Sequence, residues 1–162
     1  MKKIILSIFT IIVILFFVQK ANAQPFYYDN AIGVCLGESN GVTYKYFSGE
    51  NKAAIEAILS YSKPNNDSIW RLTGLYEFYH NIDVSVTTPG LLWYYGIGAS
   101  IGSRKTASDR YLFGSIDGVI GVDYKIEKLP INLSLDWKSA VEFLPTTKFD
   151  IGGVNLSVRY TF

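Results

Sequence analysis

Several charged side chains stand between apolar residues, in stretches of this sequence where large apolar residues tend to occupy every second position. Single charges enclosed away from water are costly, whereas opposite charges that pair and hydrogen-bond are tolerated. If the polar side of the pattern is enclosed, its four bases and five acids are therefore predicted to pair in an interior charge network. They are Lys45, Arg71, Lys138, Arg159, Glu56, Glu77, Asp117, Asp123 and Asp136.

Residue types suited to proton transfer or nucleophilic attack are scarce. The chain has one histidine, His80, and one cysteine, Cys35. A lone histidine without a placed partner is a weak candidate for acid–base catalysis, and His80 is predicted to be a solvated turn residue. Cys35 has no second cysteine to pair with and is predicted to be a small packed residue. One His and one Cys give no metal-ligand spacing, so no catalytic residue, metal or cofactor is predicted.

Two further motifs have a chemical and a structural interpretation. The run Gly-Ile-Gly-Ala-Ser-Ile-Gly at 96–102 is similar to a nucleotide-binding loop, but no helical pattern follows it, which favours a strand. Arg104, Lys105, Asp109 and Arg110 fall in a polar stretch that is predicted to be a loop. Their charges could contact lipopolysaccharide phosphates or could simply be solvated.

The elements that carry these residues show a period of two, which is typical of β-strands. Large apolar residues alternate with small or polar ones in eight segments, most of them about nine to twelve residues long, the length of a tilted strand that crosses a bilayer. The segments are 30–37, 42–46, 53–61, 71–78, 93–102, 116–124, 131–138 and 154–162. Turn-forming residues separate them, with outward loops predicted near 38–41, 62–68, 103–111 and 139–150 and a longer opposite connection near 80–90.

Alternation alone fits a soluble β-sandwich as well as a membrane barrel. Three features favour the barrel. Aromatic residues gather near segment ends, as in the girdles at membrane interfaces. Glycine and serine concentrate on the polar face, as the narrow interior of an eight-stranded barrel requires. The chain also carries an export signal. The predicted fold is all-β, an eight-stranded antiparallel up-and-down transmembrane β-barrel with a packed interior.

The first 23 residues are predicted to be a signal peptide. Lys2 and Lys3 precede an almost wholly apolar run at 4–18, and Ala21 and Ala23 stand where a signal peptidase reads small residues. The run, about 15 residues, is shorter than the roughly 20 that a spanning helix needs. Cleavage is expected before Gln24, which leaves residues 24–162 as the barrel domain.

The charge of the mature chain argues against a nucleic-acid partner. Without Lys2, Lys3 and Lys20, 12 of the 15 Lys and Arg residues remain against 14 Asp and Glu, a formal balance of −2. A nucleic-acid-binding surface needs a basic excess that this chain lacks.

The end of the chain resembles the C-terminal assembly signal of bacterial outer-membrane proteins, in which alternating apolar residues precede a terminal Phe. The matching residues are Val154, Leu156, Val158, Tyr160 and Phe162. In that group the segment is recognised by the barrel-assembly machinery, which the resemblance implies here as a partner. Residues 24–162 as a whole are similar to small eight-stranded outer-membrane barrels of the OmpX and OmpA-barrel kind. The short motifs that carry this likeness begin at Asn30, Gly41 and Ile131.

The resemblance implies a location in the outer membrane of a Gram-negative cell, in contact with its lipids and lipopolysaccharide. The predicted function is that of a monomeric, non-enzymatic barrel that contributes to envelope structure or to surface contacts through its loops. Two alternatives remain open at this point. One is an enzyme that modifies lipid A, and the other is a porin-like channel for small solutes.

Overall fold

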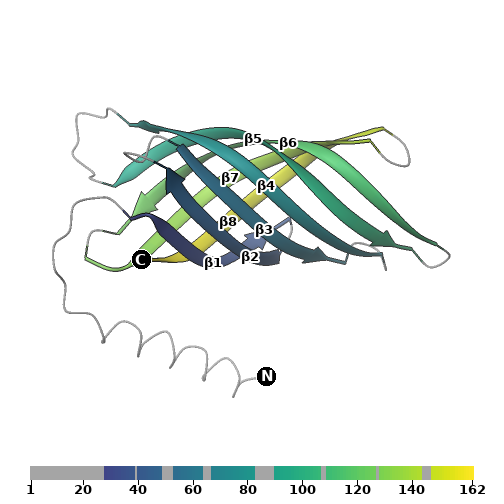
Figure 1. Cartoon of the computed structure of the whole chain (residues 1–162), viewed down its shortest axis with the longest axis horizontal. Helices are drawn as coiled ribbons and strands as arrows, with labels where there is room; N and C mark the ends of the chain where they lie inside the picture. The colour runs from purple at the N-terminus through teal and green to yellow at the C-terminus, as the bar shows by residue number, and fades with distance from the viewer. Residues whose placement is uncertain are drawn as a thin grey trace, which may run out of the picture.

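The structure is a computed structural model in which eight β-strands form a closed barrel (Figure 1). It describes residues 28–38, 40–48, 53–63, 67–82, 90–106, 109–126, 128–143 and 147–162. The strands are β1 (Asn30–Gly37), β2 (Asn40–Ser48), β3 (Ala53–Ser62), β4 (Ser68–Asn81), β5 (Leu91–Lys105), β6 (Arg110–Lys125), β7 (Ile131–Glu142) and β8 (Lys148–Thr161). The predicted signal peptide, residues 1–23, lies outside the described residues.

Each strand pairs antiparallel with its neighbours in sequence, and β1 closes the ring by pairing with β8. The closing register places Ala31 opposite Thr161 and Gly37 opposite Asn155. Closure leaves no strand edge with unpaired backbone groups, which is the condition for a sheet inside a bilayer. The predicted eight-stranded up-and-down barrel is confirmed, and the alternative of a two-sheet sandwich is wrong.

The alternation in the sequence becomes an apolar outer surface and a polar interior. Large apolar side chains point outward on every strand, and Ile97 on β5, for example, is 61 % exposed. The inward positions hold buried charged and hydroxyl side chains, of which Lys45 is 0 % exposed. This reverses the arrangement of a water-soluble protein and matches a barrel whose outside meets lipid tails.

The two ends of the barrel are named by the strand ends that lie there. The proximal end is the one at which β1 begins and β8 ends, where the backbones of Asn30 and Phe162 are hydrogen-bonded to each other (Figure 1). The distal end is the opposite one, where β1 is followed by β2, β3 by β4, β5 by β6 and β7 by β8.

Among the described residues, no helix is long and apolar enough to cross a membrane.

Strands β5 to β8 extend further toward the distal end than the sequence pattern predicted. The predicted loops at 103–111 and 139–150 are wrong over most of their length, because β5 continues to Lys105, β6 starts at Arg110, β7 continues to Glu142 and β8 starts at Lys148. Arg104 and Glu142 look like loop residues in the sequence. In the structure they point into the barrel, where they pair with other interior residues.

A β-bulge distorts the pairing of β7 with β8 near the distal end. Lys138 pairs with Gly153 and Ala140 with Asp150, so two residues of β8, Ile151 and Gly152, stand opposite Ser139 alone. Gly152 has a φ of +76°, a conformation that glycine adopts without strain. The extra residue reverses the alternation, which turns Asp150 toward the interior and leaves Ile151 68 % exposed on the outside.

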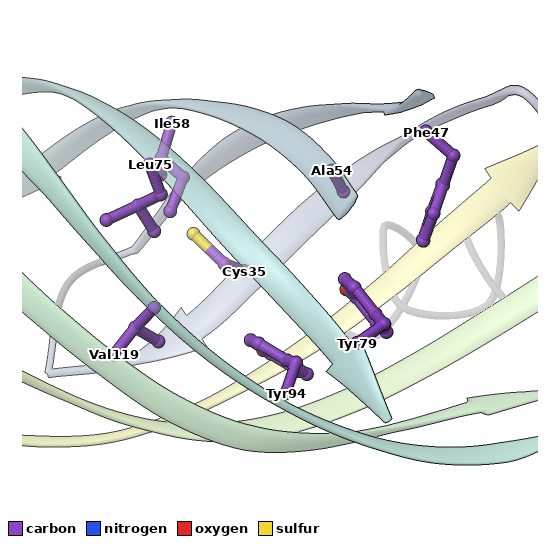
Figure 2. Close-up of a cluster of buried hydrophobic side chains, with 8 residues drawn as sticks. All are labelled: Cys35, Phe47, Ala54, Ile58, Leu75, Tyr79, Tyr94 and Val119. Atoms are coloured by element: carbon purple, nitrogen blue, oxygen red, sulfur yellow. The ribbon is translucent and has the colours of Figure 1, made fainter. Parts of the chain in front are cut away.

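Eight buried side chains form an apolar cluster inside the barrel (Figure 2). Cys35, Ile58, Leu75 and Val119 gather in one part of it, and Phe47, Ala54, Tyr79 and Tyr94 in the other (Figure 2). Cys35 is 3 % exposed, as expected of a small packed residue. The rings of Tyr79 and Tyr94 stack with their centroids 5.0 Å apart. Along β3, Ile58 lies on the distal side and Ala54 on the proximal side of Glu56, so the cluster extends to both sides of the charged groups described below.

Candidate functional site

The proximal half of the interior contains a network of five charged side chains, Lys45, Glu56, Glu77, Asp123 and Arg159, here called the Lys45 network. The Lys45 ammonium lies 2.8 Å from Oε2 of Glu77, 3.3 Å from Oε2 of Glu56 and 3.8 Å from Oδ2 of Asp123. The ammonium also donates to the Tyr79 hydroxyl at 2.8 Å. Three carboxylates therefore surround one cation that has no contact with solvent.

Arg159, on β8, joins the same network through Glu56. Its guanidinium forms a salt bridge with Glu56 and donates to the Ser134 hydroxyl at 2.7 Å and to the Asn132 side-chain oxygen at 3.3 Å. Its Nε donates to the Thr43 hydroxyl at 3.3 Å, and Thr43 in turn donates to Glu56. Arg159 is 1 % exposed. Hydrogen bonds to several partners are what make a buried charge tolerable.

The other four charged residues singled out in the sequence lie elsewhere in the interior. Asp117 accepts hydrogen bonds from Ser100 at 2.6 Å and from Ser115 at 3.3 Å. Asp136 accepts from Tyr94 at 3.1 Å and from Asn155 at 3.4 Å. Lys138 forms no ion pair with a described residue and lines a cavity at the distal end. Arg71, the fourth, belongs to a second cluster at that end.

The second cluster is formed by Arg71, Arg104 and Glu142. Nη2 of Arg71 lies 2.8 Å from Oε1 of Glu142, and Nη2 of Arg104 lies 3.4 Å from the same oxygen. Both guanidinium groups also lie over the Phe113 ring, at 5.1 Å and 5.6 Å from its centroid. Arg104 Nη1 donates to the Tyr111 hydroxyl at 3.3 Å. The two arginines therefore share a salt-bridge partner, Glu142, and a cation–π contact with the buried Phe113 ring.

A layer of small polar and apolar residues separates the two charged clusters. Along β4 the inward positions run Arg71, Thr73, Leu75 and Glu77 from the distal end toward the proximal end. Thr73 is hydrogen-bonded to Ser100 at 2.7 Å, and Leu75 belongs to the apolar cluster of Figure 2. The interior is thus filled in layers, with charges in both halves and packed side chains between them.

A cavity of about 420 Å³ opens on the distal side of Arg71 and Arg104 and is here called the vestibule. Its charged lining residues are Glu38, Lys63, Arg71, Arg104, Lys138 and Asp150. Side chains of Asn40, Ser60, Ser62 and Ser139 contribute polar groups to the same wall. Burial of the Glu38 carboxyl, followed by the nearby Asp150 carboxylate, raises the pKa of Glu38 above its usual value, while Arg71 and Lys138 oppose the shift.

The sequence pattern missed Arg104, Tyr111 and Glu142 as interior residues, because all three fell in predicted loops. A signal for Tyr111 exists. The period of two that starts at Ile116 extends backward, with Leu112 and Gly114 on the apolar side and Tyr111 and Phe113 on the other. Leu112 is 74 % exposed and Phe113 is 3 % exposed, as that extension would require.

The lone histidine and the C-terminal residues both lie on the outer surface. His80 was predicted to be a turn residue, which is wrong: it lies in β4, and its ring stacks on Trp93 and Tyr95 with centroids 4.8 Å and 5.5 Å away. The residues that resemble an assembly signal form the last outward-facing stripe of the barrel. Their exposed fractions range from 40 % to 60 % for Val154, Leu156, Val158, Tyr160 and Phe162.

Metal-ligating side chains are not brought together in the part of the chain that the structure describes. No group of three or more His, Cys, Asp or Glu residues there is placed to hold a metal ion. The clusters that do form contain lysine and arginine with carboxylates, whose chemistry is ion pairing and anion binding.

Fold and site together define an all-β, closed eight-stranded antiparallel up-and-down barrel with an apolar outside and a charged, filled inside. Neisserial surface protein A has a similar crystal structure, with a TM-score of 0.50 and 11 % sequence identity over 82 % of this chain and 93 % of that one. A likeness at this identity shows the fold. No protein-family model matches the sequence, and no curated protein sequence matches it significantly.

Proposed function

We propose that this chain is an integral protein of the bacterial outer membrane with no enzymatic activity. It contributes to envelope structure or to surface contacts through its distal loops. One observation carries the proposal: the barrel is closed, with large apolar side chains exposed all around it and buried ion pairs inside. In water, such an outer surface would be a contiguous apolar patch far larger than soluble monomers expose.

The proposed export route is the secretory one, with residues 1–23 removed as a signal peptide. Because the number of strands is even, both ends of the barrel domain lie at the proximal end. In the proposed orientation, this end faces the periplasm and the distal end faces outward. Outer-membrane lipids and lipopolysaccharide are the proposed surroundings, and the barrel works as a monomer. The likeness in fold to Neisserial surface protein A supports this location.

Cell fractionation with heat-modifiability on gels tests this proposal, because folded barrels of this kind keep their structure in detergent until boiled. We expect the processed protein in the outer-membrane fraction, with a band that shifts after boiling. Processed protein in the soluble periplasmic fraction would contradict the proposal. The filled interior also supports the expectation that the purified protein gives no conductance in planar bilayers, and a steady open channel would favour the porin-like alternative.

The barrel-assembly machinery is the proposed partner of the C-terminal stripe. Phe162 is 60 % exposed and has no interior role. Replacing it in F162S is expected to lower the amount of barrel assembled in cells while leaving folding of the purified protein into lipid vesicles unchanged. As a matched control, F149S removes a phenylalanine that is 69 % exposed at the start of β8, outside the proposed signal. Equal losses of assembly for F162S and F149S would contradict this role.

A further inference from the structure

The vestibule gathers several basic side chains at the distal end of the barrel. Four bases contribute to it, and they come from three separate strands and one strand end: Lys63, Arg71, Arg104 and Lys138. Two acids, Glu38 and Asp150, share the lining, and Glu142 lies against the two arginines. Counting Glu142, the bases outnumber the acids, four to three, in and next to this cavity.

The two arginines keep hydrogen-bonding capacity that the described residues do not use. A guanidinium carries five N–H donors. Arg71 donates one hydrogen bond to a described residue, from Nη2 to Glu142. Nε of Arg104 is buried and has no partner among the described residues. The Phe113 ring fixes both guanidinium groups, so the unused donors are held in place before a ligand arrives.

Lys138 adds a cation that no carboxylate of the described residues neutralises by an ion pair. It is half-buried in β7 and lines the vestibule beside Ser139. An ammonium that lines an open cavity and forms no salt bridge there is available to an anion that enters. A buried acid would be the usual partner in this interior, as Glu77 is for Lys45. The position of Lys138 thus points to a ligand of negative charge.

The acids of the vestibule each interact with a neighbouring group. Both arginines form salt bridges with Glu142. Burial, and after it the nearby Asp150 carboxylate, raises the pKa of Glu38, while Arg71 and Lys138 oppose the shift. Asp150 accepts a hydrogen bond from the backbone N–H of Gly152 at 3.0 Å.

We propose that the vestibule binds a phosphate group, carried either by a small soluble ligand or by a lipid headgroup. Arginine forks and a lysine point charge are the usual partners of phosphate oxygens. Arg71, Arg104 and Lys138 supply them, and serine hydroxyls at 60, 62 and 139 complete the wall. The volume of about 420 Å³ is within the range of small-molecule sites. The site stands on this geometry, and only the source of the phosphate depends on the proposed location in the outer membrane.

Calorimetry with the folded full barrel in a phosphate-free nonionic detergent tests the soluble source, with inorganic phosphate as the probe. The lipid source is tested in micelles of the same detergent with a minor fraction of phosphatidic acid, by native mass spectrometry of the retained lipid. Saturable phosphate binding with a Kd of about 1 mM or tighter identifies a soluble ligand. Retention of phosphatidic acid without such binding identifies a headgroup. No binding in either arm would overturn the proposal.

A pair of lysine substitutions separates the vestibule from general surface charge. K138Q removes a cation that lines the cavity and breaks no ion pair among the described residues, so the barrel is expected to fold. It is expected to weaken phosphate binding about tenfold or more, the effect of losing one charge-assisted hydrogen bond. K105Q makes the same change at an exposed residue of the distal end that is not part of the cavity wall. Its binding is expected to stay within about twofold of the parent.

Equal affinities of K138Q and the parent protein would overturn the proposal. So would an equal loss in K105Q, because the effect would then come from the net charge of the distal end. Both variants keep the Arg71, Arg104 and Glu142 cluster, so both are expected to fold. The gel shift on boiling checks that they do. The measurements use purified protein, and their failure is therefore distinct from a failure of the proposed cellular location.

Discussion

Lys45 and Glu56 stand directly opposite each other in the register of β2 and β3, and their side chains form a buried ion pair with an Nζ–Oε2 distance of 3.3 Å. A pair of neighbouring strands thus supplies a cation and an anion at the same height of the lumen. Arg159 from β8 contacts the same Glu56. Because every member is nearly or fully buried, the loss of one leaves the others with uncompensated charge.

Removing Arg159 is expected to destabilise the barrel strongly. In R159M, Glu56 keeps Lys45 but loses its second cation, and Asn132 and Ser134 lose their donor. Breaking a buried pair on one side costs about 3–5 kcal/mol. Urea unfolding in lipid vesicles, followed by tryptophan fluorescence, measures this cost. The matched control is R110M, at an exposed position at the start of β6. A loss in R159M no larger than in R110M would show that the network contributes little.

The sequence pattern predicted the strands well where one face carries large apolar residues and the other carries small or polar ones. Along β8 the outward Val154, Leu156 and Val158 alternate with small or polar residues, and this contrast is what a period of two reports. The same pattern failed near Arg104 and Glu142. A polar residue that points into a polar lumen has the same composition as a loop residue. Only its partner distinguishes the two, and that partner lies on another strand.

The interior partners themselves could not be predicted from the alternating pattern. Arg71 pairs with Glu142 across 71 positions of the chain, and Arg159 with Glu56 across 103. Which pairs meet depends on the register of each strand pair, and a shift in register changes every opposed residue. The β-bulge at Gly152 is an example, since it decides that Asp150 faces the vestibule. Alternation assigns a residue to a face but does not set its height in the barrel.

An arginine on the outer surface at mid-height is expected to be costly if that surface meets lipid. Ile97 lies near the middle of β5 and is 61 % exposed. Arginine at the midplane of a bilayer costs about 2–4 kcal/mol, and near an interface about 0–1 kcal/mol. We therefore expect I97R to lower the free energy of unfolding in vesicles by the larger amount. L112R, at a residue that is 74 % exposed near the distal end of β6, is expected to cost the smaller amount. Equal effects of the two would indicate an outer surface in water.

The Glu38 carboxyl is expected to make the barrel more stable in mild acid than at neutral pH. The pKa of Glu38 is raised in the folded state by burial and by Asp150, with Arg71 and Lys138 acting against the shift. A carboxyl with a raised folded-state pKa contributes stability below its unfolded pKa, and the contribution is lost as pH rises through the folded-state pKa. The thermal midpoint of the parent is therefore expected to fall between pH 4 and neutrality by more than that of E38Q. The exposure of Glu38 keeps the difference small. Identical pH profiles would show that the Glu38 carboxyl has the same pKa in both states.

Gly152 is expected to be a position where even a methyl group cannot be added without loss. Its φ of +76° is strained for any residue with a Cβ atom, and a Cβ built there would lie 1.5 Å from the Lys138 carbonyl oxygen. G152A is therefore expected to cost at least about 2 kcal/mol, the scale of such backbone strain, with a shift of β8 against β7. G74A is the matched control, because an added Cβ at Gly74 meets nothing within 4 Å and a glycine within a strand is itself unfavourable. Unfolding midpoints in vesicles measure both variants. If G152A is as stable as G74A, the bulge does not depend on glycine, and Asp150 would keep its place in the vestibule for another reason.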